Sequence, residues 1–228
     1  ITLTSGGCAT EITLPPPAGD MPVVVAQLEA GTDVTRFTVF WSVPSPALLG
    51  RPVAAADVDL VLAESGGSGA PLLAVPDSGG VFRATLPIIG GRTYALHGRV
   101  AGIPVTGTTT VPEPLDIVAP RGGPFPRPGP LARDLPFHFR SRGSVSFHFT
   151  GLAHGSWRGV RDTLGSLAEY WFPFGSDTAA SATTVKVTGY NADWDAWAGS
   201  TDFTLSNLTG VSGVPGGTAS ATTELRRQ

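Results

Sequence analysis

The sequence is short of charged side chains, and above all of lysine and cysteine. Charged residues make up only 14% of the 228 residues, and Lys186 is the only lysine. The net charge of −3 gives no reason to expect nucleic acid or an anionic membrane surface as a partner. Cys8 is the only cysteine, which excludes an intrachain disulfide and a cysteine-based metal cluster.

Long apolar runs and catalytic signatures are also missing. No stretch reaches the roughly 18 to 20 apolar residues that a membrane-spanning helix needs. There is no G-x-S-x-G nucleophile motif, and no glycine-rich stretch leads from a strand into a helix, as a phosphate-binding loop does. We therefore expect no enzymatic activity and no cofactor.

Glycine and proline, by contrast, are abundant, with 30 and 21 residues. These residues leave little room for long helices and favour many short strands joined by turns. The hydrophobic fraction of 41% is enough for a packed core. Composition therefore predicts an all-β protein.

Alternating apolar residues predict an immunoglobulin- or transthyretin-like antiparallel sandwich over residues 23–118, with about seven short strands. Its clearest hairpin joins Thr93–Val100 to Pro104–Val111 through the turn Ala101-Gly102-Ile103, and we expect this hairpin at the closing edge of a sheet. The other clear strands are Val23–Glu29, Val34–Trp41, Val58–Leu62 and Val81–Leu86.

Residues 119–130, A-P-R-G-G-P-F-P-R-P-G-P, predict a linker to a second β-rich domain over residues 131–228. In that domain we expect a hairpin of Leu135–Arg140 and Val145–Thr150, a strand over Thr183–Tyr190 and one short helix over Asn191–Gly199. Asn191 suits the helix N-cap and Gly199 its end. The tail from Val211 is rich in Gly, Ser and Thr, and only one last strand-like run is expected in it.

Residues 1–22 are expected to form a tether and spacer. Ser5-Gly6-Gly7-Cys8 is similar to the end of a bacterial lipoprotein signal, although an aliphatic residue is usual where Ser5 stands. Cys8 is therefore a candidate lipid anchor, and the alternative is a lone cysteine in a loose segment. Pro15-Pro16-Pro17 would make the spacer stiff and extended.

Histidines and aspartates raise two alternatives for metal binding. A three-residue loop in the expected hairpin would put His138 and His148 on one face, with His154 near in sequence, whereas a two-residue turn would put them on opposite faces. We expect solvent-facing histidines and no metal. Calcium could use the oxygens of five aspartates, none of which forms a D-x-D-x-D-G loop: Asp57, Asp59, Asp193, Asp195 and Asp202.

Aromatic residues are concentrated in the second half of the chain. They have two interpretations: a patch that contacts a sugar or a protein, or the core of a glycine-rich domain. We expect an interaction patch that includes at least one exposed tryptophan. Its candidate members are Trp157, Tyr170, Trp171, Phe172, Trp194 and Trp197.

Four segments, taken in their order along the chain, resemble the DUF4249 family of uncharacterised bacterial surface lipoproteins, and the third and fourth carry the clearest motifs. Gly91–Leu96 through Thr110-Val111-Pro112 is similar to that family's "G-x-x-Y-x-L … T-x-V-P" hairpin, and Ser206–Val214 to its "S-N-I-x-G-G-x-G-V-F" ending. Pro215 stands where that ending has an aromatic residue. The other two segments are Val23–Glu29, which follows Cys8 and its spacer, and Ala55–Leu60 before a glycine-rich tip.

The resemblance implies an extracytoplasmic, membrane-associated β protein, often encoded beside TonB-dependent receptors, without known catalytic residues. We therefore expect a non-enzymatic binding or structural protein of the periplasm or cell surface. It would be an accessory subunit on the periplasmic or outer face of a larger membrane protein complex, with the other subunits as partners. The alternative is a surface lipoprotein that captures carbohydrate or another nutrient for a TonB-dependent transporter.

Overall fold

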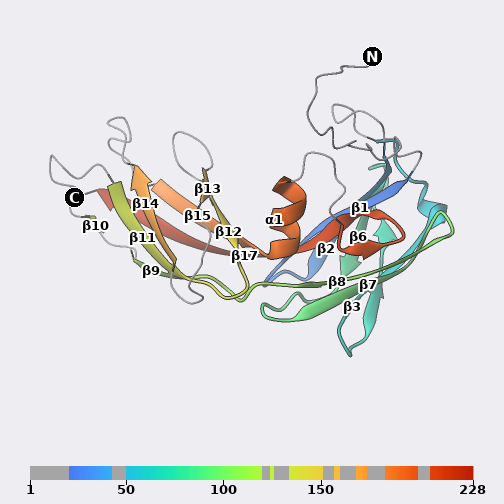
Figure 1. Ribbon diagram of the computed structural model, residues 1–228, viewed down its shortest axis with the longest axis horizontal. Helices are drawn as coiled ribbons and strands as arrows, with labels where there is room; N and C mark the ends of the chain where they lie inside the picture. Colours follow the sequence, from blue (N-terminus) through green and yellow to red (C-terminus); the bar gives the residue numbers. More distant parts are fainter. Residues whose placement is uncertain are drawn as a thin grey trace, which may run out of the picture.

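The computed structural model describes residues 21–42, 50–119, 124–125, 134–150, 157–159, 168–173, 183–199 and 206–227. These residues are mostly β-strand, which confirms the all-β class, and they include the predicted short helix α1 (Ala192–Gly199) (Figure 1). No helix among them combines the length and apolarity that a membrane span requires.

The first nine strands are β1 (Pro22–Glu29), β2 (Val34–Trp41), β3 (Val58–Glu64), β4 (Gly69–Pro71), β5 (Leu73–Ala74), β6 (Val81–Thr85), β7 (Thr93–Val100), β8 (Ile103–Thr110) and β9 (Asp116–Ala119). The remaining strands are β10 (Pro124–Phe125), β11 (Asp134–Arg140), β12 (Ser146–Thr150), β13 (Trp157–Gly159), β14 (Ala168–Pro173), β15 (Thr183–Tyr190), β16 (Leu208–Thr209) and β17 (Ser212–Arg227).

The described strands form three sheets. The largest has the order β13-β12-β15-β17-β1-β2-β6-β5, with β10 beside the end of β17. A five-stranded sheet, β16-β8-β7-β3-β4, packs against the part of the large sheet that contains β1, β2 and β6. The third sheet, β14-β11-β9, belongs to the second unit, where Phe139 of β11 meets Phe147 of β12 edge to face, with ring centroids 4.6 Å apart. The result is a sandwich followed by a second β-rich unit, as predicted.

One strand, β17, belongs to both units. Its first part pairs in parallel with β1, from Val23↔Ser212 to Glu29↔Thr218. Its second part pairs antiparallel with β15, from Tyr190↔Thr218 to Thr183↔Leu225. Thr218 is therefore the residue at which the strand changes partner, and Figure 1 shows β17 passing beneath α1 from one unit to the other.

This topology corrects the predicted domain boundaries. The prediction assigns residues 208–218 to a domain of residues 131–228. They instead extend the N-terminal sandwich, because β16 pairs with β8 and the first part of β17 pairs with β1. Asp116–Ala119, at the end of the predicted 23–118 sandwich, pairs instead with β11 of the second unit. The tail from Val211 forms a 16-residue strand rather than a mostly irregular segment.

The predicted hairpin of Leu135–Arg140 and Val145–Thr150 is wrong. β11 pairs with β14 and β9, whereas β12 pairs with β13 and β15. Phe139 of β11 and Phe147 of β12 are both buried, and they face each other between two different sheets rather than across a hairpin.

The hairpin of β7 and β8 is confirmed, but its position and turn differ from the prediction. It lies inside the five-stranded sheet, between β3 and β16, and not at its edge. Val100 pairs with Ile103, so the turn has two residues, Ala101 and Gly102, with positive φ angles of 50° and 79°. Positive φ at both positions matches the right-handed twist of a hairpin.

Buried Tyr94 of β7 fixes the segment that follows β6. Its hydroxyl donates to the carbonyl of Pro87 at 3.0 Å and accepts a bond from the backbone N–H of Ile89 at 2.7 Å. The buried hydroxyl therefore has both a hydrogen-bond acceptor and a donor, and the Pro87 carbonyl and the Ile89 N–H each have a partner at the border of the core.

Candidate functional site

The best-defined polar cluster surrounds the start of α1, where the two units meet. The side-chain oxygen of Asn191 accepts a bond from the backbone N–H of Trp194 at 3.1 Å, which confirms the predicted N-cap. Its amide nitrogen donates to Thr109 Oγ1 at 2.7 Å and to the carbonyl of Thr110 at 3.0 Å. Thr109 Oγ1 in turn donates to Asp193 Oδ2 at 3.0 Å. Asn191 therefore joins α1 to β8 of the N-terminal sandwich.

Replacement of Asn191 by alanine is expected to lower the free energy of unfolding by about 2–3 kcal/mol. The change removes the cap and leaves the Thr110 carbonyl and the Thr109 hydroxyl without their amide partner in a buried position. Urea denaturation measures the loss. Asn191→Ser restores the capping oxygen but not the amide, so it should cost less than alanine, and equal losses would contradict a role for the cap.

Two consecutive glycines let β17 approach its neighbours closely on both faces. A Cβ on Gly216 would lie 2.7 Å from the Cβ of Trp194, and one on Gly217 would lie 2.7 Å from the Cα of Val111. Neighbouring residues of a strand point to opposite faces. α1 therefore rests on one face of the large sheet, and the five-stranded sheet lies on the other.

A row of aromatic side chains extends from this helix onto β15 and β12. The ring centroids of Trp194 and Trp197 are 5.3 Å apart, and those of Tyr190 and Trp194 are 6.4 Å apart, with an interplanar angle of 17°. His148 of β12 continues the row, 6.5 Å from Tyr190. All four side chains are half-buried, so each retains some surface open to solvent.

Polar side chains lie on the same face of the sheet as Tyr190. Thr188 and Lys186 alternate with buried Val187 along β15, so they share the face of Tyr190. Ser220, opposite Thr188 on β17, donates to Glu29 Oε1 at 2.8 Å, and its oxygen lies 3.2 Å from that of Thr188. A hydroxyl has one proton, so Thr188 must donate to Ser220.

Lys186 completes this polar group, since its Nζ lies 3.2 Å from Glu29 Oε1. Glu29 ends β1, so the pair joins a strand of the N-terminal sandwich to a strand of the second unit. Both side chains are partly exposed, and an exposed ion pair contributes at most about 1 kcal/mol. The aromatic and polar groups together are called the junction face below: Glu29, His148, Lys186, Thr188, Tyr190, Trp194, Trp197 and Ser220.

The structure describes the side chains of some of the residues predicted for the interaction patch and the lipid anchor, but not of others. Trp194 and Trp197 lie together, and sequence reasoning missed that Tyr190 and His148 belong to the same row. Cys8 lies outside the described residues, so the lipid anchor stays a prediction. Trp157, Tyr170, Trp171 and Phe172 lie on β13 and β14, and their side chains are outside the described part of the chain.

The two alternatives for a histidine metal site both depended on the hairpin, which does not form. His138 pairs with Glu169 and Ala119, and His148 with Arg158 and Thr188. His154 and Asp202 lie outside the described residues. Within the described ranges, no group of three or more His, Cys, Asp or Glu side chains is placed to hold a metal ion.

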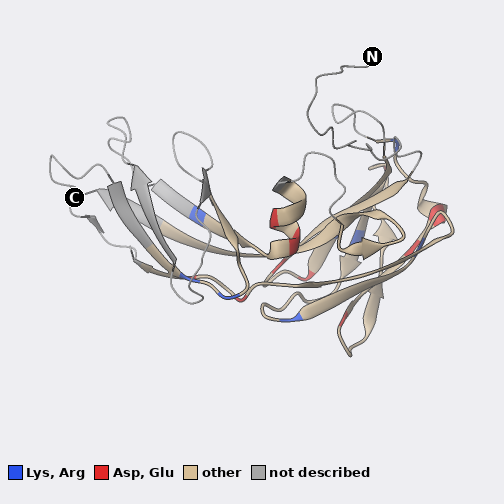
Figure 2. Cartoon of the chain, viewed as in Figure 1, with Lys and Arg blue, Asp and Glu red and all other residues tan. Residues whose placement is uncertain are grey.

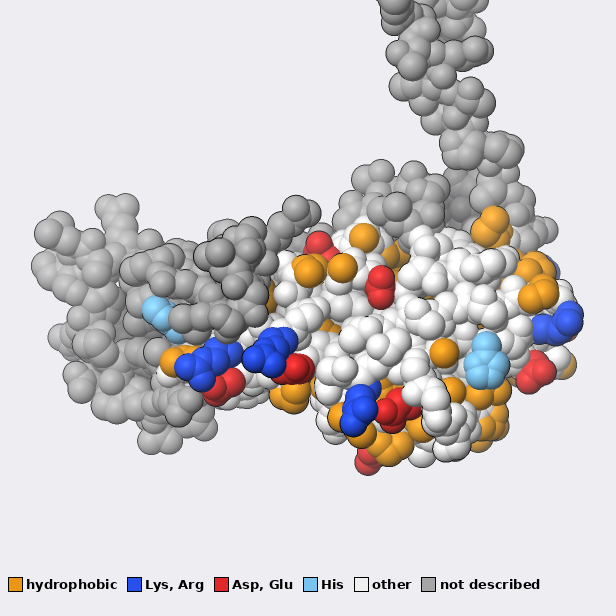
Figure 3. All heavy atoms as spheres, turned by 60° about the horizontal axis from the view of Figure 1, so that its bottom comes forward, with side chains coloured by type: hydrophobic (Ala, Val, Ile, Leu, Met, Phe, Trp, Pro, Cys, Tyr) orange, Lys and Arg blue, Asp and Glu red, His pale blue; other side chains and the backbone are white. Residues whose placement is uncertain are grey.

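Charged groups are sparse, and α1 carries two of the acidic ones, Asp193 and Asp195 (Figure 2). On the side of the molecule away from α1, charged side chains of both signs are scattered in small groups (Figure 3). No protein-family model matches the sequence, and no curated protein matches it either.

Proposed function

We propose that this chain is a non-enzymatic binding and structural protein, which acts as an accessory subunit on the periplasmic or outer face of a membrane protein complex. The junction face is the observation that supports this function best. Its aromatic and polar side chains come from β1, β12, β15, β17 and α1, so sheet and helix backbone hold them in place. Contact residues on regular elements need little ordering when a partner binds.

The proposal also draws on the resemblance to surface lipoproteins. Its four segments, residues 23–29, 55–60, 91–112 and 206–214, all contribute to the N-terminal sandwich. Of these segments only Glu29 belongs to the junction face, so the rest would serve as its supporting framework.

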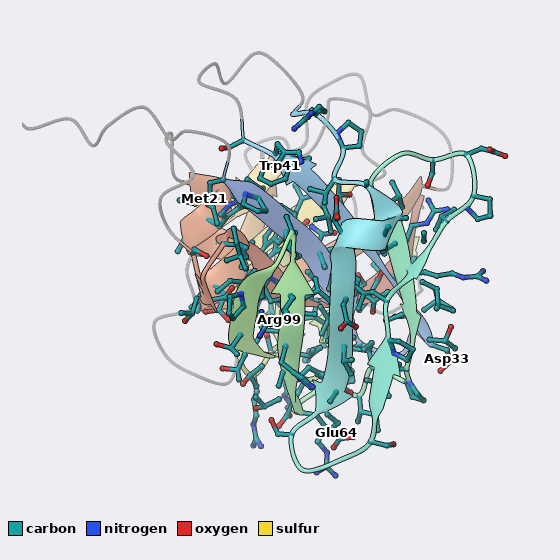
Figure 4. All side chains as sticks on the ribbon, turned by 90° about the vertical axis from the view of Figure 1, so that its right-hand side faces the viewer. Met21, Asp33, Trp41, Glu64 and Arg99 are labelled. Atoms are coloured by element: carbon teal, nitrogen blue, oxygen red, sulfur yellow. The ribbon has the colours of Figure 1, made fainter. Side chains whose placement is uncertain are left out.

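Site-specific photo-crosslinking in native membranes tests the proposal. A photoreactive residue in place of Ala196, exposed on α1, should give discrete crosslinks to membrane proteins. The same residue in place of Arg99, exposed on β7 of the sheet on the other side, is the matched control (Figure 4). Absence of crosslinks from both positions, together with elution as a free monomer after detergent extraction, would contradict an accessory subunit.

A second candidate function is that of a surface lipoprotein that captures carbohydrate or another nutrient for a TonB-dependent transporter. The combination of aromatic rings with hydroxyl groups and a carboxylate on the junction face favours it. The two candidates differ in the occupant of this face, a protein surface or a small polar molecule.

A further inference from the structure

The rings of the junction face offer apolar contact on a fixed support. Trp194 lies against the backbone of Gly216, and its ring stacks beside Tyr190. The bond from the Trp194 N–H to the capping oxygen of Asn191 also holds this turn of α1 against β8. Tyr and Trp side chains of this kind have an apolar body and a polar tip, which suits them to amphipathic ligands.

Hydrogen-bonding groups lie directly beside these rings. Thr188 follows Tyr190 on the same face of β15, and Ser220 and Glu29 continue across β17 and β1. The hydroxyl protons of Thr188 and Ser220 are already used, so their remaining lone pairs accept bonds. Lys186 has three protons, of which Glu29 takes one in the structure, and the others are available as donors.

The charged groups of this region are engaged with partners inside the protein. Lys186 and Glu29 compensate each other. On α1, the carboxylate of Asp193 is likewise engaged, with Thr109 and Asn191. The charged side chains that the structure describes here thus have partners within the protein, and the groups left to a ligand are aromatic faces and hydroxyl oxygens. The fitting ligand is neutral, with an apolar face and several hydroxyl groups.

We propose that the junction face binds a neutral saccharide. This inference rests on the proposed binding function and names the class of ligand. The C–H face of a sugar ring stacks on Tyr190 and Trp194, while its hydroxyl groups donate to Thr188, Ser220 and Glu29 and accept from Lys186. His148 and Trp197 border the ring on either side of this contact.

Titration of the full chain with maltohexaose, cellohexaose and xylohexaose tests the proposal. The chain is labelled with 5-fluorotryptophan, and each of its five tryptophans gives one fluorine resonance. At least one of the three sugars should shift the resonances of Trp194 and Trp197 and leave that of Trp41 in place. Trp41 pairs with Pro22 at the start of β1, whereas Trp194 lies against Gly216, which pairs with Gln27 five residues further along, roughly 16 Å away along the strand. Figure 4 shows Trp41 near Met21 at this end of the sandwich.

Matched variants locate the site. Trp194→Ala should raise the dissociation constant for the sugar about tenfold, and Trp41→Ala should leave it unchanged. Trp194→Phe keeps a ring against Gly216, so it preserves the fold if alanine does not, and should bind with an intermediate constant. Ser220→Ala should also weaken binding.

Three results would overturn the proposal. One is the absence of any tryptophan shift with all three neutral sugars. Another is binding that Trp194→Phe and Ser220→Ala leave unchanged. The third is preferential, salt-sensitive binding of polygalacturonate, which would mean an anion site. The photo-crosslinking from Ala196 is independent of these results, so failure to bind sugar does not decide whether the chain is an accessory subunit.

Discussion

Replacement of Gly213 by alanine is expected to lower the free energy of unfolding by at least about 3 kcal/mol. Gly213 lies in β17 with a φ angle of 114°, which an L-residue adopts only at a cost of about 1–3 kcal/mol. A Cβ there would also overlap the carbonyl oxygen of Val24 on β1. The clash is with backbone, so relief requires β1 and β17 to separate where they pair. Urea denaturation followed by tryptophan fluorescence measures the loss.

Gly31 is the matched control, since it also has a positive φ, of 85°, and lies in the turn between β1 and β2. A Cβ on Gly31 would meet no atom within 4 Å. Gly31→Ala should therefore cost only the conformational strain, about 1–2 kcal/mol. Equal losses for the two variants would show that a Cβ at position 213 is accommodated without separating β1 from β17.

The local features of the fold were predictable from sequence because their causes are local. Alternation along Val34–Trp41 gives buried Phe37 and Val39 and exposed Arg36 and Thr38, as expected. Asn191 caps its own helix by a contact three residues away. Such signals need no knowledge of the rest of the chain.

The pairing of β17 could not be predicted because its causes are distant in sequence. A parallel pair between β1 and β17 joins residues almost 190 positions apart, and no turn signals it. Gly213, Gly216 and Gly217 suggested an irregular tail, since glycine usually weakens a strand. In this strand the missing side chains make room for Val24, Trp194 and Val111.

The candidate site was predictable only in part for the same reason. Trp194 and Trp197 were both candidates from sequence, and their spacing of three residues puts them on one helix face. His148 and Ser220 join them only through the order of strands in the large sheet. The polar half of the junction face therefore has no signal in the sequence.

Replacement of Phe147 by alanine is expected to cost about 3–5 kcal/mol of stability. Phe147 is 1% exposed and packs edge to face against Phe139, so truncation leaves a cavity between the two sheets of the second unit. Phe147→Leu keeps most of the volume and should cost about 1 kcal/mol. Calorimetry measures both losses.

The same variant tests whether the shared strand couples the two units. β17 pairs with β15 beside β12 and with β1 in the sandwich, and Asn191 and Lys186 add contacts across the junction. We expect Phe147→Ala to lower the melting temperature in a single transition, because loss of the second unit frees half of β17 and removes the support of α1. Amide exchange at Leu28 of β1 should accelerate together with exchange at Val187 of β15. Two separate transitions, with unchanged exchange at Leu28, would show instead that the sandwich holds the first part of β17 without help from the second unit.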